Sequence, residues 1–102
     1  MNIGPYATSA VLSSSLNPST QGQALTFTAT IGSFGGAPPD GEIVTFKKGA
    51  KVLGKATLSG GIASFTTSKL KVGTTAFSAV YGGDSGFGHS TSNIIEQVVN
   101  QK

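Results

Sequence analysis

Residues 70–92, LKVGTTAFSAVYGGDSGFGHSTS, decide the fold class of this chain. In the first half of the segment, Phe77 and Ala79 alternate with the more polar Ser78, which is the two-residue period of a β-strand with one buried face. In the second half, glycines surround Asp84 and interrupt the alternation, as they do in a turn. The segment therefore predicts a half-buried antiparallel strand that runs into a glycine-rich loop.

The same pattern recurs along the rest of the chain. In residues 24–31, Leu25, Phe27 and Ala29 alternate with threonines, so one face of this strand is expected to be packed and the other solvated. Clusters of Gly, Pro, Asn and Ser separate such segments about every ten residues, the spacing of a β-sandwich or a β-barrel. The predicted strands are residues 7–15, 24–31, 42–47, 52–58, 62–67, 74–81 and 91–99, with residues 52–58 expected as two short strands bent at Gly54.

The inward faces of these strands define a predicted core. The chain contains no cysteine, so no disulfide is expected and packing alone must stabilise the fold. The predicted core residues are Leu25, Phe27, Ala29, Val44, Phe46, Leu53, Phe65, Leu70, Phe77, Ala79, Tyr81, Ile95 and Val99.

The length of 102 residues predicts a single domain, because it is near the most common domain size. We expect residues 1–102 to form this domain, with a core over about residues 8–100, and we expect it to be one module of a larger multidomain protein. Residues 1–10, MNIGPYATSA, lack the basic-then-apolar pattern of a signal peptide. No apolar run approaches the roughly 20 residues of a membrane span, so membrane insertion is not expected.

The charge pattern argues against a nucleic-acid partner. The net charge is +3, but every basic residue is a lysine. Arginine, which forks onto phosphates and guanine edges, is absent, and no aromatic residues are interleaved with the lysines. Charged residues make up only 11% of the chain, and this low-charge, hydroxyl-rich composition predicts an extracellular, secreted or cell-surface location.

Three blocks together resemble the group 3 bacterial Ig-like family. They are SSLNPSTQGQALTFTATI at residues 14–31, GEIVTFKKGAKVLGKATLSGGIASFTTSKL at residues 41–70 and AVYGGDSGFGHSTS at residues 79–92. The resemblance covers the chain from about Thr8 to Asn100. It implies an all-β, immunoglobulin-like antiparallel β-sandwich of about seven strands with Greek-key connections. It also implies a place, often in tandem copies, in a large secreted or surface-anchored bacterial protein, where such modules act as spacers and adhesive repeats.

The ionisable residues do not suggest an active site. Common hydrolytic enzymes need a base beside a nucleophile, or two carboxylates that face a bond. The chain has one histidine, His89, in a loop of small residues, and four carboxylates. A zinc site is not expected, since thiolates are absent and only one imidazole is present. We therefore predict that the protein is not an enzyme and has no catalytic residue, no cofactor and no required metal.

Calcium is the one metal for which the sequence offers candidate ligands. In an immunoglobulin-type sandwich, loops 32–41 and 82–90 lie at the same end, so Asp40, Glu42 and Asp84 are candidate calcium ligands. The alternative is that Asp84, in Gly-Gly-Asp-Ser-Gly, accepts hydrogen bonds from nearby backbone amides and fixes its own turn. The sequence favours this second interpretation.

The same end of the sandwich carries two loop phenylalanines. Phe34 and Phe87, together with Asp84, form a candidate ligand-binding loop tip, because exposed rings stack on sugars. The alternative for Phe87 is a ring that packs over the edge of the core. For Phe34 the sequence favours neither the exposed nor the buried position.

Charge is expected to differ between the two ends of the molecule. In the immunoglobulin arrangement the acidic residues above lie at one end, and a lysine-rich end lies opposite. The residues expected there are Lys47, Lys48, Lys51, Lys69 and Lys71.

We expect a non-catalytic extracellular module that serves as a spacer or adhesion repeat. Its expected partners are neighbouring domains of the same chain, with a cell-surface glycan or protein as a further partner, and the module itself is expected to be a monomer. Two alternatives stay open: a carbohydrate-binding module of a secreted enzyme, and a decoration domain of a phage particle. The sequence of the parent protein would distinguish them.

Overall fold

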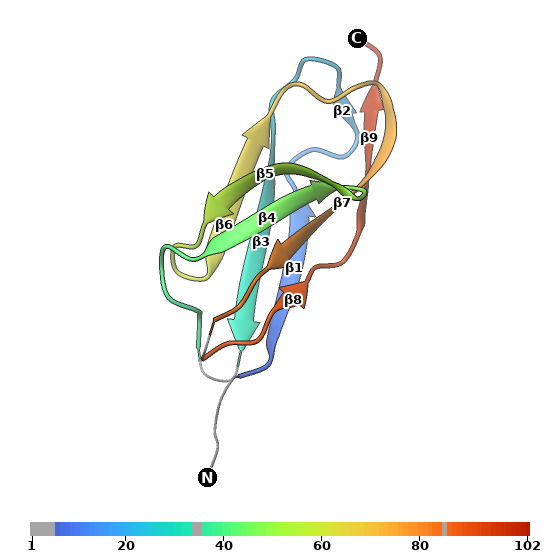
Figure 1. Cartoon of the computed structure of the whole chain (residues 1–102). Coiled ribbons are helices and arrows are strands. Elements are labelled where there is room, and N and C mark those ends of the chain that lie inside the picture. The colour runs from blue at the N-terminus through green and yellow to red at the C-terminus, as the bar shows by residue number, and fades with distance from the viewer. Residues whose placement is uncertain (1–5, 34–35, 85) are drawn as a thin grey trace.

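The computed structural model describes residues 6–33, 36–84 and 86–102. These residues form two β-sheets packed face to face, without a helix among them (Figure 1). The strands are β1 (Thr8–Ser14), β2 (Ser19–Thr20), β3 (Leu25–Ser33), β4 (Ile43–Lys48), β5 (Lys51–Thr57), β6 (Ile62–Thr67), β7 (Gly73–Tyr81), β8 (Ser90–Thr91) and β9 (Ile95–Asn100). The described chain contains no helix that could span a membrane.

One sheet has the strand order β1-β3-β6 and is antiparallel throughout. The other has the order β2-β9-β7-β4-β5, with β8 also paired to β7. Its pairs are antiparallel except for β2 and β9, which run parallel. The chain crosses between the sheets from β1 to β2, from β2 to β3, from β3 to β4, from β5 to β6 and from β6 to β7. This confirms the expected antiparallel immunoglobulin-like sandwich.

The prediction of one continuous strand over residues 91–99 is wrong. The segment divides into β8 and β9; between them Ser92 stays bonded to β7, and Asn93 bonds to β1 instead. The backbone N–H of Ser92 donates to the carbonyl of Ala79, and the Ser92 hydroxyl accepts from the N–H of Ala79. The side chain of Asn93 binds the backbone of Leu12 on β1 through both its amide oxygen and its amide nitrogen. The side chains of Ser92 and Asn93 therefore make hydrogen bonds where a continuous strand would use backbone groups. The alternation of apolar and polar residues cannot reveal such bonds.

The prediction of two short strands within residues 52–58 is also wrong. The segment is a single strand, β5, that contains a register shift. Phe46 pairs with Gly54 while the next residue, Lys47, pairs with Val52, so Leu53 is the extra residue of a β-bulge. The bend expected near Gly54 is thus accommodated without breaking the strand.

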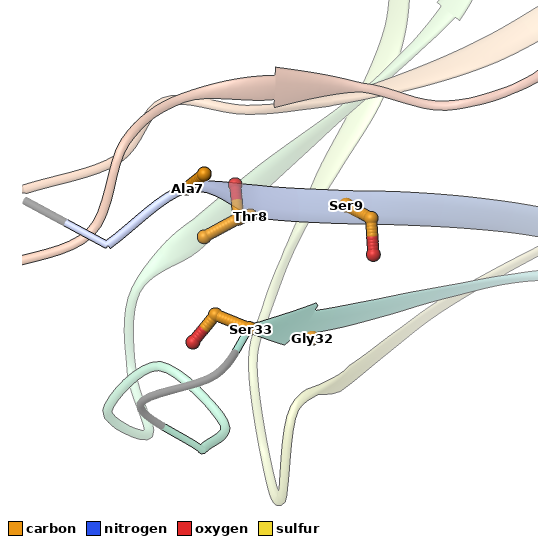
Figure 2. A pocket seen from close by; sticks show the side chains of 5 residues that line it. All are labelled: Ala7, Thr8, Ser9, Gly32 and Ser33. Carbon is orange, nitrogen blue, oxygen red and sulfur yellow. The ribbon is translucent and has the colours of Figure 1, made fainter.

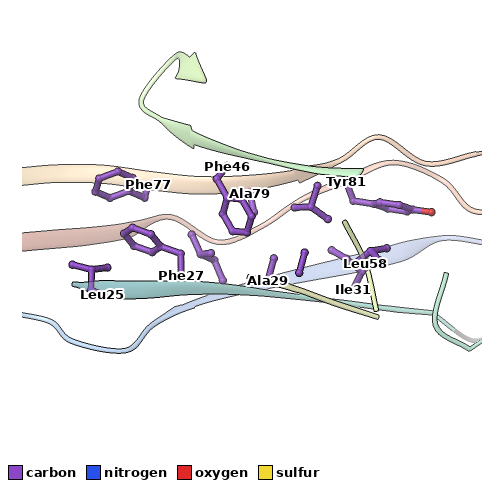
Figure 3. Packing of buried hydrophobic residues seen from close by; sticks show 12 residues of the cluster. Leu25, Phe27, Ala29, Ile31, Phe46, Leu58, Phe77, Ala79 and Tyr81 are labelled. Carbon is purple, nitrogen blue, oxygen red and sulfur yellow. The ribbon is translucent and has the colours of Figure 1, made fainter. Parts of the chain in front are cut away.

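The core lies between the two sheets (Figure 3). Phe27 of β3 and Phe77 of β7 face each other from opposite sheets, with ring centroids 4.7 Å apart. Every residue of the predicted core is either fully buried or partly buried against the core. Four further buried apolar residues are absent from the predicted core list, Leu12, Ile31, Leu58 and Ala63, although strand alternation places Ile31 and Ala63 on inward faces and Leu58 is expected as an anchor of its strand.

Gly54 shows why one core position requires glycine. The ring of Phe65 lies directly against the Gly54 backbone and also stacks on Phe46, with centroids 5.8 Å apart. A Cβ atom added to Gly54 would lie only 2.9 Å from Cζ of Phe65 and closer still to the edge of the ring. The absence of a side chain at Gly54 therefore makes room for the aromatic pair.

We expect Gly54→Ala to lower the free energy of unfolding by about 1–3 kcal/mol, because the new methyl group displaces the Phe65 ring. Equilibrium urea denaturation measures this change. Gly32→Ala is the matched control, since no atom lies within 4 Å of a Cβ built at this second strand glycine. Equal effects of the two substitutions would contradict the packing of Phe65 on Gly54.

A buried amide closes the side of the sandwich where β1 meets β9. The side chain of Gln97 is fully buried, with 0% of its surface exposed. Its Oε1 accepts from the Ser14 hydroxyl at 2.7 Å, and its Nε2 donates to the carbonyl of Leu16 at 2.7 Å and to that of Val98 at 3.2 Å. Gln97 thus fixes the turn after β1 to the sheet that holds β9.

Asn17 adds a second connection at the same place. Its Oδ1 accepts from the backbone N–H of Val98, and its Nδ2 donates to the carbonyl of Glu96, both at 3.0 Å. This side chain therefore bonds to β9 as a neighbouring strand would. The chain bends at Asn17-Pro18, where the peptide bond between the two residues is cis.

The sandwich is elongated, with principal extents of 57 × 21 × 18 Å. Figure 1 places the start of β1 near one end of the long axis and the end of β9 at the other. The loop after β7 lies at the first end, together with the loop that precedes β4. We call this end, formed by Tyr6, Asp40–Glu42 and the loop 82–88, the entry tip.

Candidate functional site

The loop 82–88 of the entry tip is held by its own aspartate. Oδ1 of Asp84 accepts from the backbone N–H groups of Gly86, at 2.7 Å, and Phe87, at 2.9 Å. The backbone N–H of Asp84 in turn donates to the carbonyl of Phe87. At Gly83, φ is +78°, and an added Cβ would lie 2.7 Å from the Phe87 carbonyl oxygen. The turn is therefore compact, and Asp84 has the hydrogen bonds of an Asx-turn.

Two carboxyl groups meet beside this turn. The side chains of Glu42, just before β4, and Asp84, just after β7, share a hydrogen bond, and the Tyr81 hydroxyl donates to Oε1 of Glu42. The hydrogen bond to Asp84 raises the pKa of Glu42 above its ordinary value. The hydrogen bond from Glu42, and then the backbone N–H of Gly86, lower the pKa of Asp84. Where only one of the two carboxyl groups carries a proton, these opposite shifts place it on Glu42, which can then donate to the ionised Asp84.

The third candidate calcium ligand is engaged elsewhere. Oδ1 of Asp40 accepts from the backbone N–H of Gly60 at 2.9 Å, which fixes the turn between β5 and β6. Within the described ranges, no group of three or more Asp, Glu, His or Cys side chains could hold a metal ion. The tip thus brings Glu42 and Asp84 together but does not bring Asp40 into the pair.

Whether Glu42 and Asp84 bind calcium can be tested directly. Because Asp84 already has two backbone donors, we expect millimolar calcium to leave the melting temperature unchanged relative to EDTA. A clear rise with calcium would instead identify the carboxyl pair as a cation site. Thermal unfolding followed by circular dichroism, in calcium and in EDTA, distinguishes the two outcomes.

The aromatic ring of the tip is partly buried. Phe87 packs against the core cluster, and its ring centroid lies 5.9 Å from that of Tyr6. Tyr6 itself is 40% exposed. Only part of the Phe87 surface is therefore open to a ligand. Phe34, the other candidate of the predicted loop tip, lies outside the described residues.

The segment that leads into β1 is bonded to the same loop. The N–H of Tyr6 donates to the carbonyl of Gly86 at 2.9 Å, and the N–H of Gly88 donates to the carbonyl of Tyr6 at 2.7 Å. The hydroxyl of Thr8 donates to the carbonyl of Gly88, also at 2.7 Å. Tyr6 and Phe87 thus form a single parallel β-bridge, and the Thr8 hydroxyl adds a side-chain bond next to it. The sequence pattern missed the roles of Tyr6 and Thr8, since neither precedes a recognisable turn.

A shallow hollow lies near this tip, between the start of β1 and the end of β3 (Figure 2). It is lined by Ala7, Thr8, Ser9, Gly32 and Ser33. None of these residues has an ionisable or aromatic side chain, so the hollow provides neither an acid–base group nor a ring for sugar stacking. The one histidine, His89, is exposed.

The carboxyl pair predicts a specific pH dependence. The contribution of Glu42, whose pKa is raised on folding, is complete at low pH and is lost as the pH rises through that pKa. The contribution of Asp84, whose pKa is lowered, is lost as the pH falls through its folded pKa. The pair therefore stabilises the tip most at pH values between the folded pKa of Asp84 and the folded pKa of Glu42.

Glu42→Gln tests this pair, because the glutamine amide can donate to Asp84 and accept from Tyr81 without a titrating proton. We expect the melting temperature of the variant, relative to the original protein, to rise as the pH increases above the unfolded value of about 4.3 and Glu42 loses its proton, and then to level off. Glu96→Gln, on exposed β9, is the control and should show no such trend. A pH-independent difference for Glu42→Gln would contradict the shared proton.

The two sheets and the entry tip define an immunoglobulin-like β-sandwich module. A model of the bacterial Ig-like domain (group 3) family matches residues 12–100, so the chain belongs to that family, as the three sequence blocks indicate. Domains of this family are generally not enzymes, and they typically occur in surface or secreted proteins. Comparison with the curated proteins and with the solved structures gives no match.

Proposed function

We propose that the protein is a non-catalytic extracellular module that acts as a spacer or adhesion repeat in a bacterial surface or secreted protein. One observation carries the proposal: the chain enters at one end of the long axis, bonded to the entry tip, and leaves at the other end. A module with this geometry extends a larger chain by nearly its full length. The hydrogen bonds of Tyr6 to Gly86 and Gly88 restrict the direction of the incoming segment, which favours a stiff array over a flexible one.

Charge supports contact between neighbouring modules. Glu42 and Asp84 lie at the entry tip, whereas Lys69 and Lys71 lie in the loop before β7, near the end of β9. A following module would present its acidic tip to this lysine-bearing loop. Exposed pairs contribute at most about 1 kcal/mol each and are screened at physiological salt, so this contact orients neighbours rather than locking them together.

Small-angle scattering of a chain with two copies in tandem tests the spacer function. We expect an extended envelope, and a narrower distribution of interdomain shapes at low salt than at high salt. Neutralisation of charge by Lys69→Gln with Lys71→Gln should remove the salt dependence and leave the extension. A compact envelope, with the two copies folded back on each other, would contradict the spacer. Binding to a glycan array that is lost in a stable Phe87→Ala variant would instead favour a carbohydrate-binding module.

A further inference from the structure

The β6 strand leaves one edge of the smaller sheet unpaired. β3 and β6 pair with Phe27 opposite Phe65, and the N–H of Ile31 donates to the carbonyl of Gly61. This register points the backbone groups of Phe65 toward β3 and those of Ser64 and Thr66 away from it. Within the described ranges no backbone partner is present for the outward N–H and C=O groups of Ser64 and Thr66.

The other three edges are each protected. The edge of β1 is covered by the bonds of Asn93 to Leu12 and by the bridge between Tyr6 and loop 86–88. β2 has only two residues, and β5 contains the bulge and two lysines, Lys51 and Lys55. Short strands, bulges and lysines are the devices that normally prevent pairing between sheet edges.

The sequence of β6, IASFTT, has none of these devices. It contains no charged residue and no proline, and its register with β3 is unbroken. On the outer face, Ser64 and Thr66 continue the hydroxyl rows of Thr28 and Thr26, and the Thr26 and Thr66 hydroxyls are 2.8 Å apart. In Figure 1 the strand lies at the side of the molecule, next to β5 but paired only to β3.

We propose that the β6 edge pairs with the β6 edge of a second copy of this chain, antiparallel and about a two-fold axis at Phe65. In this register Ser64 of each copy exchanges both backbone hydrogen bonds with Thr66 of the other, so the unpaired groups of the two strands satisfy one another. The two Phe65 rings, each only partly buried in a single copy, become cross-strand neighbours.

The absence of charge on β6 favours a second copy of this chain as the pairing partner. The chain carries a net charge of +3, so copies repel on average, but the β6 edge brings two uncharged strands together. A contact between two six-residue strands is about 20 Å long and only one strand wide. The surface area that it buries is therefore well below the roughly 1,600 Å² of a standard stable interface. The pairing is therefore weak, dilute protein stays monomeric, and the contact gains strength where many copies lie side by side.

Cysteine trapping tests the register, because the chain has no cysteine of its own. Ser64→Cys and Thr66→Cys are made as separate single variants and mixed in a glutathione redox buffer. The proposed pairing places these two positions directly opposite each other, at a Cα separation of about 5.5 Å that suits a disulfide. We expect the mixed dimer in about tenfold excess over the two homodimers together, since only that combination has disulfide geometry.

The control mixture is Ser13→Cys with Ser15→Cys, at exposed positions near the covered β1 edge. It should give mixed dimers and homodimers in the equal amounts that random collision produces. The same statistical mixture from the β6 variants would overturn the proposal.

Amide exchange gives a readout without cysteines. The Thr66 N–H should exchange at least about twofold more slowly in concentrated than in dilute protein, and Ser64→Lys should abolish the difference. Protection that appears only with an unrelated extended peptide would assign the edge to another partner and would overturn pairing with a second copy.

Discussion

Phe27→Ala is expected to lower the free energy of unfolding by about 3–5 kcal/mol, which is the range for truncating a buried aromatic ring. Phe27 is 1% exposed, and its ring contacts Phe77 of the opposite sheet at a centroid distance of 4.7 Å. The substitution therefore opens a cavity between the sheets, where neither backbone can move in to fill it. A loss of this size is a large part of the roughly 5–15 kcal/mol that stabilises a typical domain.

Denaturation by urea at neutral pH measures the loss, with Val11→Ala as the matched control. Val11 lies on the outer face of β1 and is 58% exposed, so its truncation should change stability by less than about 0.5 kcal/mol. A loss under about 1 kcal/mol for Phe27→Ala would mean that the inward face of β3 is assigned wrongly.

The inward faces could be predicted from the sequence because they depend on a short-range rule. Phe27 and Phe77 each lie in a strand where apolar and small polar residues alternate, and a period of two fixes which side chains share a face. This pattern can be recognised without knowledge of the partner strand. Leu12 was omitted because β1 alternates weakly, with the apolar but exposed Val11 beside it.

The ladder interruptions could not be predicted in this way. Asn93 and Asn17 each bond to a strand that is about 80 residues away in the chain, and a polar residue in a loop carries no local sign of such a partner. The ring of Phe65 likewise comes from another strand to fill the space that Gly54 leaves, next to the bulge at Leu53. These features follow from the meeting of distant segments rather than from local preference.

The entry tip shows the same division between local and distant information. The Asx-turn of Asp84 follows from Gly-Gly-Asp-Ser-Gly alone, and the shared end of loops 32–41 and 82–90 follows from the topology. The contact of Glu42 with Asp84 also includes the Tyr81 hydroxyl, which donates to Glu42 and opposes the rise of its pKa; a period-two pattern places Tyr81 in the core without indicating this hydroxyl.

Gln97 is the buried residue that alternation explains least, since it is a polar side chain at an inward position of β9. Its amide group is held in one orientation by hydrogen bonds: Oε1 accepts from the Ser14 hydroxyl, and Nε2 donates to the carbonyls of Leu16 and Val98. A side chain of equal size that lacks the two N–H donors cannot satisfy these carbonyls.

We therefore expect Gln97→Glu, which changes only a few atoms, to lower the free energy of unfolding at pH 7 by about 3–5 kcal/mol, the cost of an uncompensated buried charge. Burial and the facing carbonyls of Leu16 and Val98 would raise the pKa of the new carboxyl group above its unfolded value. Because that pKa is raised on folding, the deficit grows as the pH rises above the unfolded value of about 4.3, and it shrinks at lower pH, where a protonated carboxyl can donate to one carbonyl.

Urea denaturation from about pH 3.5 to pH 8 measures this dependence against Gln101→Glu, the same chemical change at an exposed position after β9. The control should differ little from the original protein at every pH. A Gln97→Glu deficit that is small, or that does not change with pH, would mean that water reaches this side chain and that the junction between β1 and β9 is open. A deficit that grows with pH would instead show that the first strand is held to the last by a dry, oriented amide.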